Sequence, residues 1–140
     1  MQKLYKTSFF YLILGIICGV FYREFTKING FNGVTTLRVV HPHLLTLGFI
    51  FFLILTIIAS IYKLYEERDF GKWYTTYNVG LIFTAITMMW RGILQVKGLD
   101  FKGLNHIAGL AHAILGVGLI WFMIILGRQL KSNENNPCKN

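Results

Sequence analysis

Residues 103–127 read GLNHIAGLAHAILGVGLIWFMIILG and contain no Asp, Glu, Lys or Arg. A helix needs roughly 20 predominantly apolar residues to cross the hydrocarbon core of a bilayer, and this run is long enough. Three more runs without those four residue types precede it, at 7–22, 39–62 and 73–90. The chain is therefore predicted to be an all-α membrane protein with four transmembrane helices.

The first and third of these runs are slightly short for a span. Arg23 and Arg91 stand at their ends, and an arginine can extend a span by reaching its guanidinium to the interface. We expect one transmembrane domain over residues 1–130 and a polar, disordered tail over residues 131–140. The four spans are predicted at about 7–25, 36–62, 73–94 and 104–127.

The charge of +8 fits basic loops attracted to anionic lipid in the bilayer, and it does not indicate nucleic-acid binding. Four spans place both termini on one side of the membrane. By this topology, eight Lys and Arg residues lie on that side and six on the other. Basic loops favour the cytoplasm, so we expect a cell-membrane protein with both termini cytoplasmic. The two sets are Lys3, Lys6, Lys63, Arg68, Lys72, Arg128, Lys131 and Lys139, against Arg23, Lys27, Arg38, Arg91, Lys97 and Lys102.

An internal repeat with an offset of about 68 residues runs through the sequence. Residues 21–23 (Phe-Tyr-Arg) and 89–91 (Met-Trp-Arg) each end a span with an aromatic residue and an arginine. A glycine, Gly30 or Gly98, follows each arginine after seven residues. Aromatic–arginine pairs are also common at membrane interfaces without any repeat. A true repeat predicts two tandem hairpins of the same orientation, related by an axis along the membrane normal.

All four histidines, His41, His43, His106 and His112, fall in the second and fourth spans. The repeat relates His43 to His112, because they follow the two arginines by 20 and 21 residues. At 1.5 Å per residue, both lie about 10 Å into parallel helices. They are therefore predicted to face one ligand between them. A neutral histidine in a span can alternatively form only a hydrogen bond across a helix interface.

Haem is the ligand that two such histidines serve best, because it needs only two axial ligands from opposite sides. Copper is the alternative, and it would use His41, His43, His112 and one of Met88 or Met89. His41 and His43 are about 200° apart on a helical wheel, so they reach one ion only where Pro42 disrupts the helix. The sequence has no Cys-x-x-Cys-His motif for covalent haem attachment.

Other residues near these histidines could complete a haem site. Arg23, Arg38 and Arg91 are expected at the membrane edge nearest the pair, where a guanidinium could bind a haem carboxylate. They could instead reach only lipid headgroups. His41 and His106 could each bind a carboxylate of the cofactor, carry protons, or be only a surface residue. Glycines flank the pair and would either leave room for the cofactor or permit close helix packing; they are Gly48, Gly109, Gly116 and Gly118.

The stretch His41-Pro-His-Leu-Leu-Thr-Leu-Gly48 resembles the His-x-His-x-x-x-Leu-Gly pattern of nitric-oxide reductase large subunits, in the haem–copper oxidase superfamily. Residues 109–116 (GLAHAILG) look like another haem-ligand helix of that group. Over residues 8–128 the chain resembles a bacterial family of small four-span proteins of unknown function associated with this superfamily. The resemblance implies a b-type haem between helices, with His43 and His112 as axial ligands.

These observations favour a membrane haem b protein for electron transfer, or for sensing or handling nitric oxide or dioxygen. If it is an enzyme, we expect an oxidoreductase. Expected partners are the lipid bilayer, a redox partner or quinol, and a second copy of the chain. The open alternatives are a copper or haem–copper redox site, and a cofactor-free transporter or assembly factor with histidine proton relays.

Thiol labelling tests the topology. A Gly33→Cys variant lacking Cys18 and Cys138 should react with a membrane-impermeant maleimide applied from outside, because the loop around Phe31 is predicted to face outward. An Arg68→Cys variant should react only after permeabilisation. The opposite pattern would place the termini outside.

Overall fold

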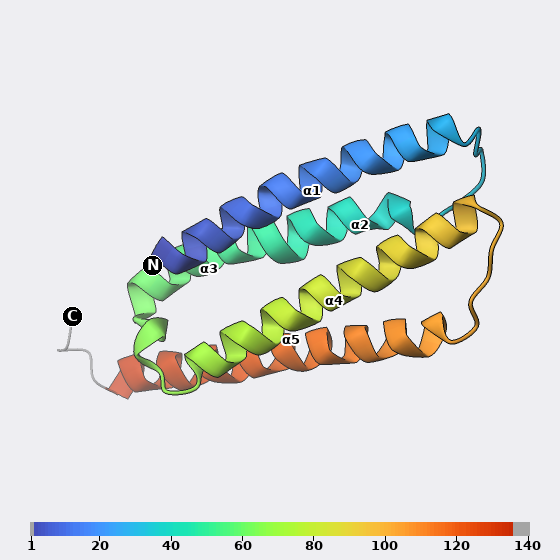
Figure 1. The fold of residues 1–140 in the computed structure, drawn as a ribbon. Helices are drawn as coiled ribbons and strands as arrows, with labels where there is room; N and C mark the ends of the chain where they lie inside the picture. The colour runs from blue at the N-terminus through green and yellow to red at the C-terminus, as the bar shows by residue number, and fades with distance from the viewer. Residues whose placement is uncertain (1, 136–140) are drawn as a thin grey trace.

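The computed structural model describes residues 2–135 and is helical throughout apart from short connections (Figure 1). Four helices are long and apolar enough to cross a membrane, which confirms the predicted fold class. The helices are α1 (Gln2–Ile28), α2 (Leu37–His43), α3 (Phe51–Tyr62), α4 (Phe70–Val96) and α5 (Leu104–Asn135). The second span combines α2, a π-helical segment at Leu44–Ile50, and α3.

The helices form two hairpins of the same orientation. In Figure 1, α1 runs antiparallel to the span of α2 and α3, and α4 runs antiparallel to α5. Helices α1 and α4 run in the same direction, as do the other two spans. Both ends of the described chain lie at one end of the bundle, and the loops after α1 and α4 lie at the other. The tandem-hairpin arrangement predicted from the repeat is therefore present.

The ends of α1 and α4 show what the repeat encodes. Each helix has 27 residues, and both their first and their last residues are separated by the repeat offset of 68. Gly30 and Gly98 take positive φ angles of 57° and 67°, which glycine adopts without steric cost. The N–H of the residue after each glycine donates to a carbonyl five residues earlier. The repeated glycines therefore end both helices in the same Schellman motif.

Polar side chains join α1 to α4 near the end that holds the termini. The Thr7 and Tyr74 hydroxyls lie 2.6 Å apart, and the Tyr11 hydroxyl donates to Asn78 Oδ1 at 2.8 Å. Both pairs are separated by 67 residues in the chain. These side chains therefore link the two helices at nearly matching depths, in agreement with the repeat.

An aromatic cluster fills the centre of the bundle. Phe51 stacks on Tyr77 with ring centroids 4.8 Å apart, and Trp73 lies 5.2 Å from Phe122. The Trp73 indole N–H donates to the Gly118 carbonyl at 2.7 Å. The cluster joins α3, α4 and α5, and the polar end of the buried indole is satisfied.

Two glycines let α4 approach its neighbours closely. A Cβ added at Gly80 would lie 2.9 Å from the Leu115 nitrogen of α5, and one at Gly92 would lie 2.5 Å from the Leu37 nitrogen of α2. Small residues of this kind let helix backbones pack closely. In a membrane the helices depend on such packing, because the hydrophobic effect does not favour helix–helix contact over helix–lipid contact.

The second span changes helical pitch directly after the histidines. Pro42 stays inside α2, so it does not break the helix, but it has no N–H to donate. The π-helical segment begins two residues later, at Leu44. Its Leu47 carbonyl accepts from the Tyr77 hydroxyl at 2.9 Å, and its Phe49 carbonyl accepts from Ser8 at 2.9 Å. Side chains from α4 and α1 therefore hold the irregular segment in place.

The helix ends differ from the predicted spans. Helix α5 continues to Asn135, so residues 131–135 extend the helix although they were expected in a disordered tail. Helices α1 and α4 begin five and three residues earlier than predicted. The rest of the tail, with Cys138 and Lys139, lies outside the described residues. Charged residues end the apolar core of a span, but they do not end the helix.

Replacing Gly92 by Ala should lower the free energy of unfolding by about 1–3 kcal/mol, the usual cost of overpacking. The Leu37 backbone that would be displaced is itself fixed, since its N–H lies 3.3 Å from Thr35 Oγ1. In a Cys138→Ser background, the reaction of buried Cys18 with a thiol dye reports thermal unfolding in detergent.

Gly71→Ala is the matched control, because nothing lies within 4 Å of a Cβ at that position of α4. It should leave stability unchanged or raise it by up to about 1 kcal/mol. Equal melting curves for the Gly92 and Gly71 variants would contradict close packing of α2 on α4.

Candidate functional site

The structure brings His43 and His112 together. His43 is the last residue of α2, and His112 lies on α5. Their ring centroids are 6.5 Å apart, with the ring planes at 85°. Two histidines 69 positions apart in the chain therefore meet between the hairpins, as the repeat predicts.

The two imidazoles are held in the same way. His43 Nδ1 lies 2.7 Å from the Val39 carbonyl, and His112 Nδ1 lies 2.7 Å from the Ala108 carbonyl. A carbonyl oxygen can only accept, so each Nδ1 carries the hydrogen and donates it. In a neutral ring the lone pair is then on Nε2. Each histidine therefore has a tautomer and ring orientation suited to binding a metal through Nε2.

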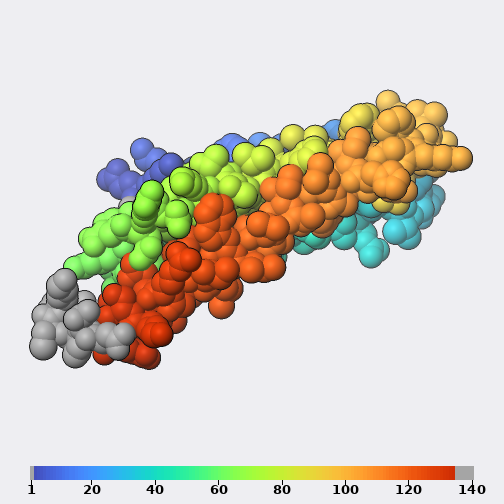
Figure 2. All heavy atoms as spheres, turned by 90° about the horizontal axis from the view of Figure 1, so that it is seen from below, coloured from blue at the N-terminus to red at the C-terminus, as the bar shows by residue number. Residues whose placement is uncertain are grey.

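The face of α5 around His112 is open. His112 is exposed, and nothing lies within 4 Å of a Cβ added at Gly109 or Gly116, one turn before and after it. Figure 2 shows α5, from orange to red, along the near side of the bundle without another described helix over it. The surface of α5 beside His112 is therefore uncovered within the described chain.

The other two glycines serve packing. A Cβ at Gly48 would overlap the Tyr11 ring, and a Cβ at Gly118 would lie 3.1 Å from the Tyr77 ring. Of the four glycines considered from the sequence, Gly109 and Gly116 leave space, whereas Gly48 and Gly118 admit an aromatic ring from a neighbouring helix.

His41 and His106 lie apart from the pair. His41 packs against α1, since a Cβ at Gly19 would lie 3.6 Å from its ring, and its buried Nδ1 has no hydrogen-bond partner in the described part of the chain. His106 is exposed near the start of α5. Among residues 2–135, no three His, Cys, Asp or Glu side chains are grouped to hold a metal ion. The arrangement offers two nitrogen ligands from opposite helices.

The three arginines lie at the loop end of the bundle, and all are exposed. Arg23 is 3.7 Å from Glu24. Arg91 lines a cavity of about 60 Å³ together with Asp100. Arg38 stands on the first turn of α2, five residues before His43. Their role beside a haem stays a prediction.

Two threonines that the sequence did not single out position the histidine-bearing helix. Thr35 Oγ1 donates to the Gly92 carbonyl and Thr36 Oγ1 donates to the Met88 carbonyl, both at 2.9 Å. The Thr36 N–H donates to Gln95 Oε1 at 2.8 Å. A threonine before an apolar span usually indicates a helix cap. Here both hydroxyls donate to α4, while Thr35 Oγ1 also accepts from the Leu37 N–H at the start of α2. These bonds fix the depth at which α2 places His43.

A family model described as "Protein of unknown function (DUF2871)" matches residues 1–129 of the chain. No curated protein and no solved structure matches it. The match covers all four spans and both histidines of the pair.

Cross-linking can test whether the pair meets, without any cofactor. In a chain lacking Cys18 and Cys138, His43→Cys and His112→Cys should be joined within one molecule by a short bifunctional thiol reagent, because the native rings are 6.5 Å apart. Intact-mass measurement separates the bridged product from two single adducts. The His41→Cys, His106→Cys pair should give single adducts only, and single adducts alone from the first pair would contradict the arrangement.

Proposed function

Because the chain belongs to the DUF2871 family of unknown function, we propose its function from its site: a membrane haem b protein with His43 and His112 as axial ligands. The observation that carries the proposal is the 6.5 Å separation of the two ring centroids. An imidazole nitrogen binds a first-row metal at about 2.0–2.1 Å. The ring centre lies about 1 Å behind that nitrogen, so two opposed ligands have centroids roughly 6 Å apart.

The hydrogen bonds of the pair support a ligand role. A metal-binding histidine almost always donates its other ring N–H to a carboxylate, carbonyl or water, which fixes its orientation and raises its basicity. His43 and His112 both have this bond, at 2.7 Å. His41 lacks it. Two coordinating histidines are expected to share this feature, and the two others in the chain do not show it.

The surroundings of the pair also suit a flat, apolar cofactor with two carboxylates. Gly109 and Gly116 leave space beside His112. Arg23 and Arg91 near the ends of α1 and α4, and Arg38 at the start of α2, supply positive charge at the loop end of the bundle. We propose these arginines as partners of the carboxylates, since guanidinium and carboxylate form paired hydrogen bonds.

A haem with both axial positions filled by histidine supplies one-electron transfer. His43 and His112 would hold the iron between α2 and α5. A redox protein or a quinol would be the electron partner. Handling nitric oxide or dioxygen requires one ligand to leave; the exposed His112 is better placed to do so than the half-buried His43.

The proposal rests on the geometry of the histidines. The family match does not connect the chain to the haem–copper oxidases, so the resemblance of residues 41–48 to nitric-oxide reductases carries no weight in it. A copper site is less well supported, because His41 faces α1 and no third His, Cys, Asp or Glu side chain joins His43 and His112 within residues 2–135.

Optical spectra of the purified protein test the proposal. After expression with ample haem, the protein should be red and show a low-spin b-type spectrum in both redox states. Replacing His43 or His112 by Ala should abolish the low-spin signal, because no other histidine can reach the vacated position. One of the two variants should retain five-coordinate haem that binds carbon monoxide.

His41→Ala and His106→Ala are the controls and should keep the low-spin spectrum. Colourless wild-type protein would overturn the haem proposal, as would an unchanged spectrum in both the His43 and the His112 variants. Measurement of bound copper would then test the alternative.

A further inference from the structure

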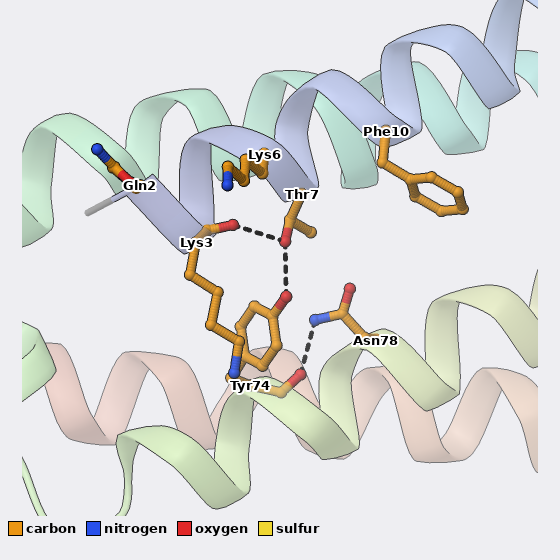
Figure 3. A pocket seen from close by; sticks show the side chains of 7 residues that line it. All are labelled: Gln2, Lys3, Lys6, Thr7, Phe10, Tyr74 and Asn78. Carbon is orange, nitrogen blue, oxygen red and sulfur yellow. Dashed lines mark hydrogen bonds between the residues drawn. The ribbon is translucent and has the colours of Figure 1, made fainter.

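A groove between α1 and α4 opens at the end of the bundle that holds the termini (Figure 3). It has a volume of about 500 Å³. Its lining is Gln2, Lys3, Lys6, Thr7, Phe10, Tyr74 and Asn78. We propose that this groove binds the headgroup of an anionic phospholipid, and that one acyl chain of the lipid continues along α4.

The charge of the groove selects an anion. Lys3 and Lys6 are its only charged lining residues, and neither forms an ion pair within the described chain. The Lys3 ammonium lies 4.2 Å from the centre of the Tyr74 ring, which holds it at the groove by a cation–π contact. Both lysines precede the first apolar run, so they lie at the depth of lipid phosphates.

An uncharged headgroup such as a quinone fits less well. A quinone needs hydrogen-bond donors, but the polar groups on the wall bind one another (Figure 3). Thr7 Oγ1 donates to the Lys3 carbonyl and lies 2.6 Å from the Tyr74 hydroxyl. The Asn78 amide nitrogen donates to the Tyr74 carbonyl. The ammonium groups of Lys3 and Lys6 stand beside the amides of Gln2 and Asn78 at the groove, and their positive charge suits a phosphate better than a neutral quinone carbonyl.

A second hollow adjoins the first and is wholly apolar apart from Asn78, which lines both. Its volume is about 450 Å³, and its lining is Asn78, Val79, Ile82, Phe83 and Ile86. From Tyr74 to Ile86, α4 rises about 18 Å, a little more than half the roughly 30 Å hydrocarbon core. A cationic groove followed by an apolar strip of this length along α4 matches a phospholipid headgroup and one acyl chain.

This site is separate from the histidine pair. Lys6 and Gly19, the residue of α1 that packs against His41, are thirteen residues apart, or about 20 Å along the helix. Changes at the groove should therefore leave any haem spectrum unaltered, and the two proposals can fail independently.

Native mass spectrometry of the detergent-purified protein tests the inference. With equal phosphatidylglycerol and phosphatidylcholine of the same chain length, the first bound lipid should be mainly phosphatidylglycerol. The Lys3→Gln, Lys6→Gln variant should lose this preference by roughly tenfold or more. Lys72→Gln, Lys131→Gln removes equal charge at the same end but outside the groove, and it should keep the preference.

A single variant tests the proposal if the double variant does not fold. Lys6→Glu, at an exposed residue, should reverse the preference towards phosphatidylcholine. Glycerol phosphate and a short-chain quinone, each in excess, should fail to displace phosphatidylglycerol. Equal binding of the two lipids, equal loss in both double variants, or displacement by either competitor would overturn the proposal.

Discussion

Inside a bilayer, a backbone N–H or C=O group has no water to bind, so the protein must complete its own hydrogen bonding. Helices α1, α4 and α5 meet this requirement by themselves, but the second span contains Pro42 and a π-helical segment. Tyr77 and Ser8 donate to carbonyls of that segment, so its irregular backbone is buried against both neighbouring helices. The Tyr77 bond also joins the first hairpin to the second.

Hydrogen bonds to α4 and close packing on it determine where the histidine pair lies. Thr35 and Thr36 bind carbonyls of α4, and Gly92 lets α2 approach it closely. Helix α4 in turn holds α5 through Trp73 and through contact at Gly80. His43 and His112 therefore meet because both of their helices pack on α4. The π-helical segment begins directly after His43, and such segments occur frequently at functional sites.

The two ends of the bundle differ in chemistry. Three arginines lie near the loop-side ends of α1, α2 and α4, and the histidine pair lies in the first three turns of the second and fourth spans, where we propose a haem. At the other end, Lys3 and Lys6 line a groove that leads to apolar surface on α4. Bonds between Thr7, Tyr74, Tyr11 and Asn78 hold α1 beside α4 there. A lipid in this groove would rest on the helix that also positions both histidines.

The sequence by itself determined the four spans, their order and the pairing of His43 with His112, because run length and repeat offset depend only on position along the chain. It also marked Gly30 and Gly98, whose positive φ only glycine readily adopts. Tertiary structure alone decided which glycines pack and which stay open, why the threonines bind α4, and where a lipid-sized groove lies. These features depend on which faces of different helices meet. In a membrane, apolar residues cover both the lipid-facing and the buried faces, so hydrophobic periodicity does not reveal them.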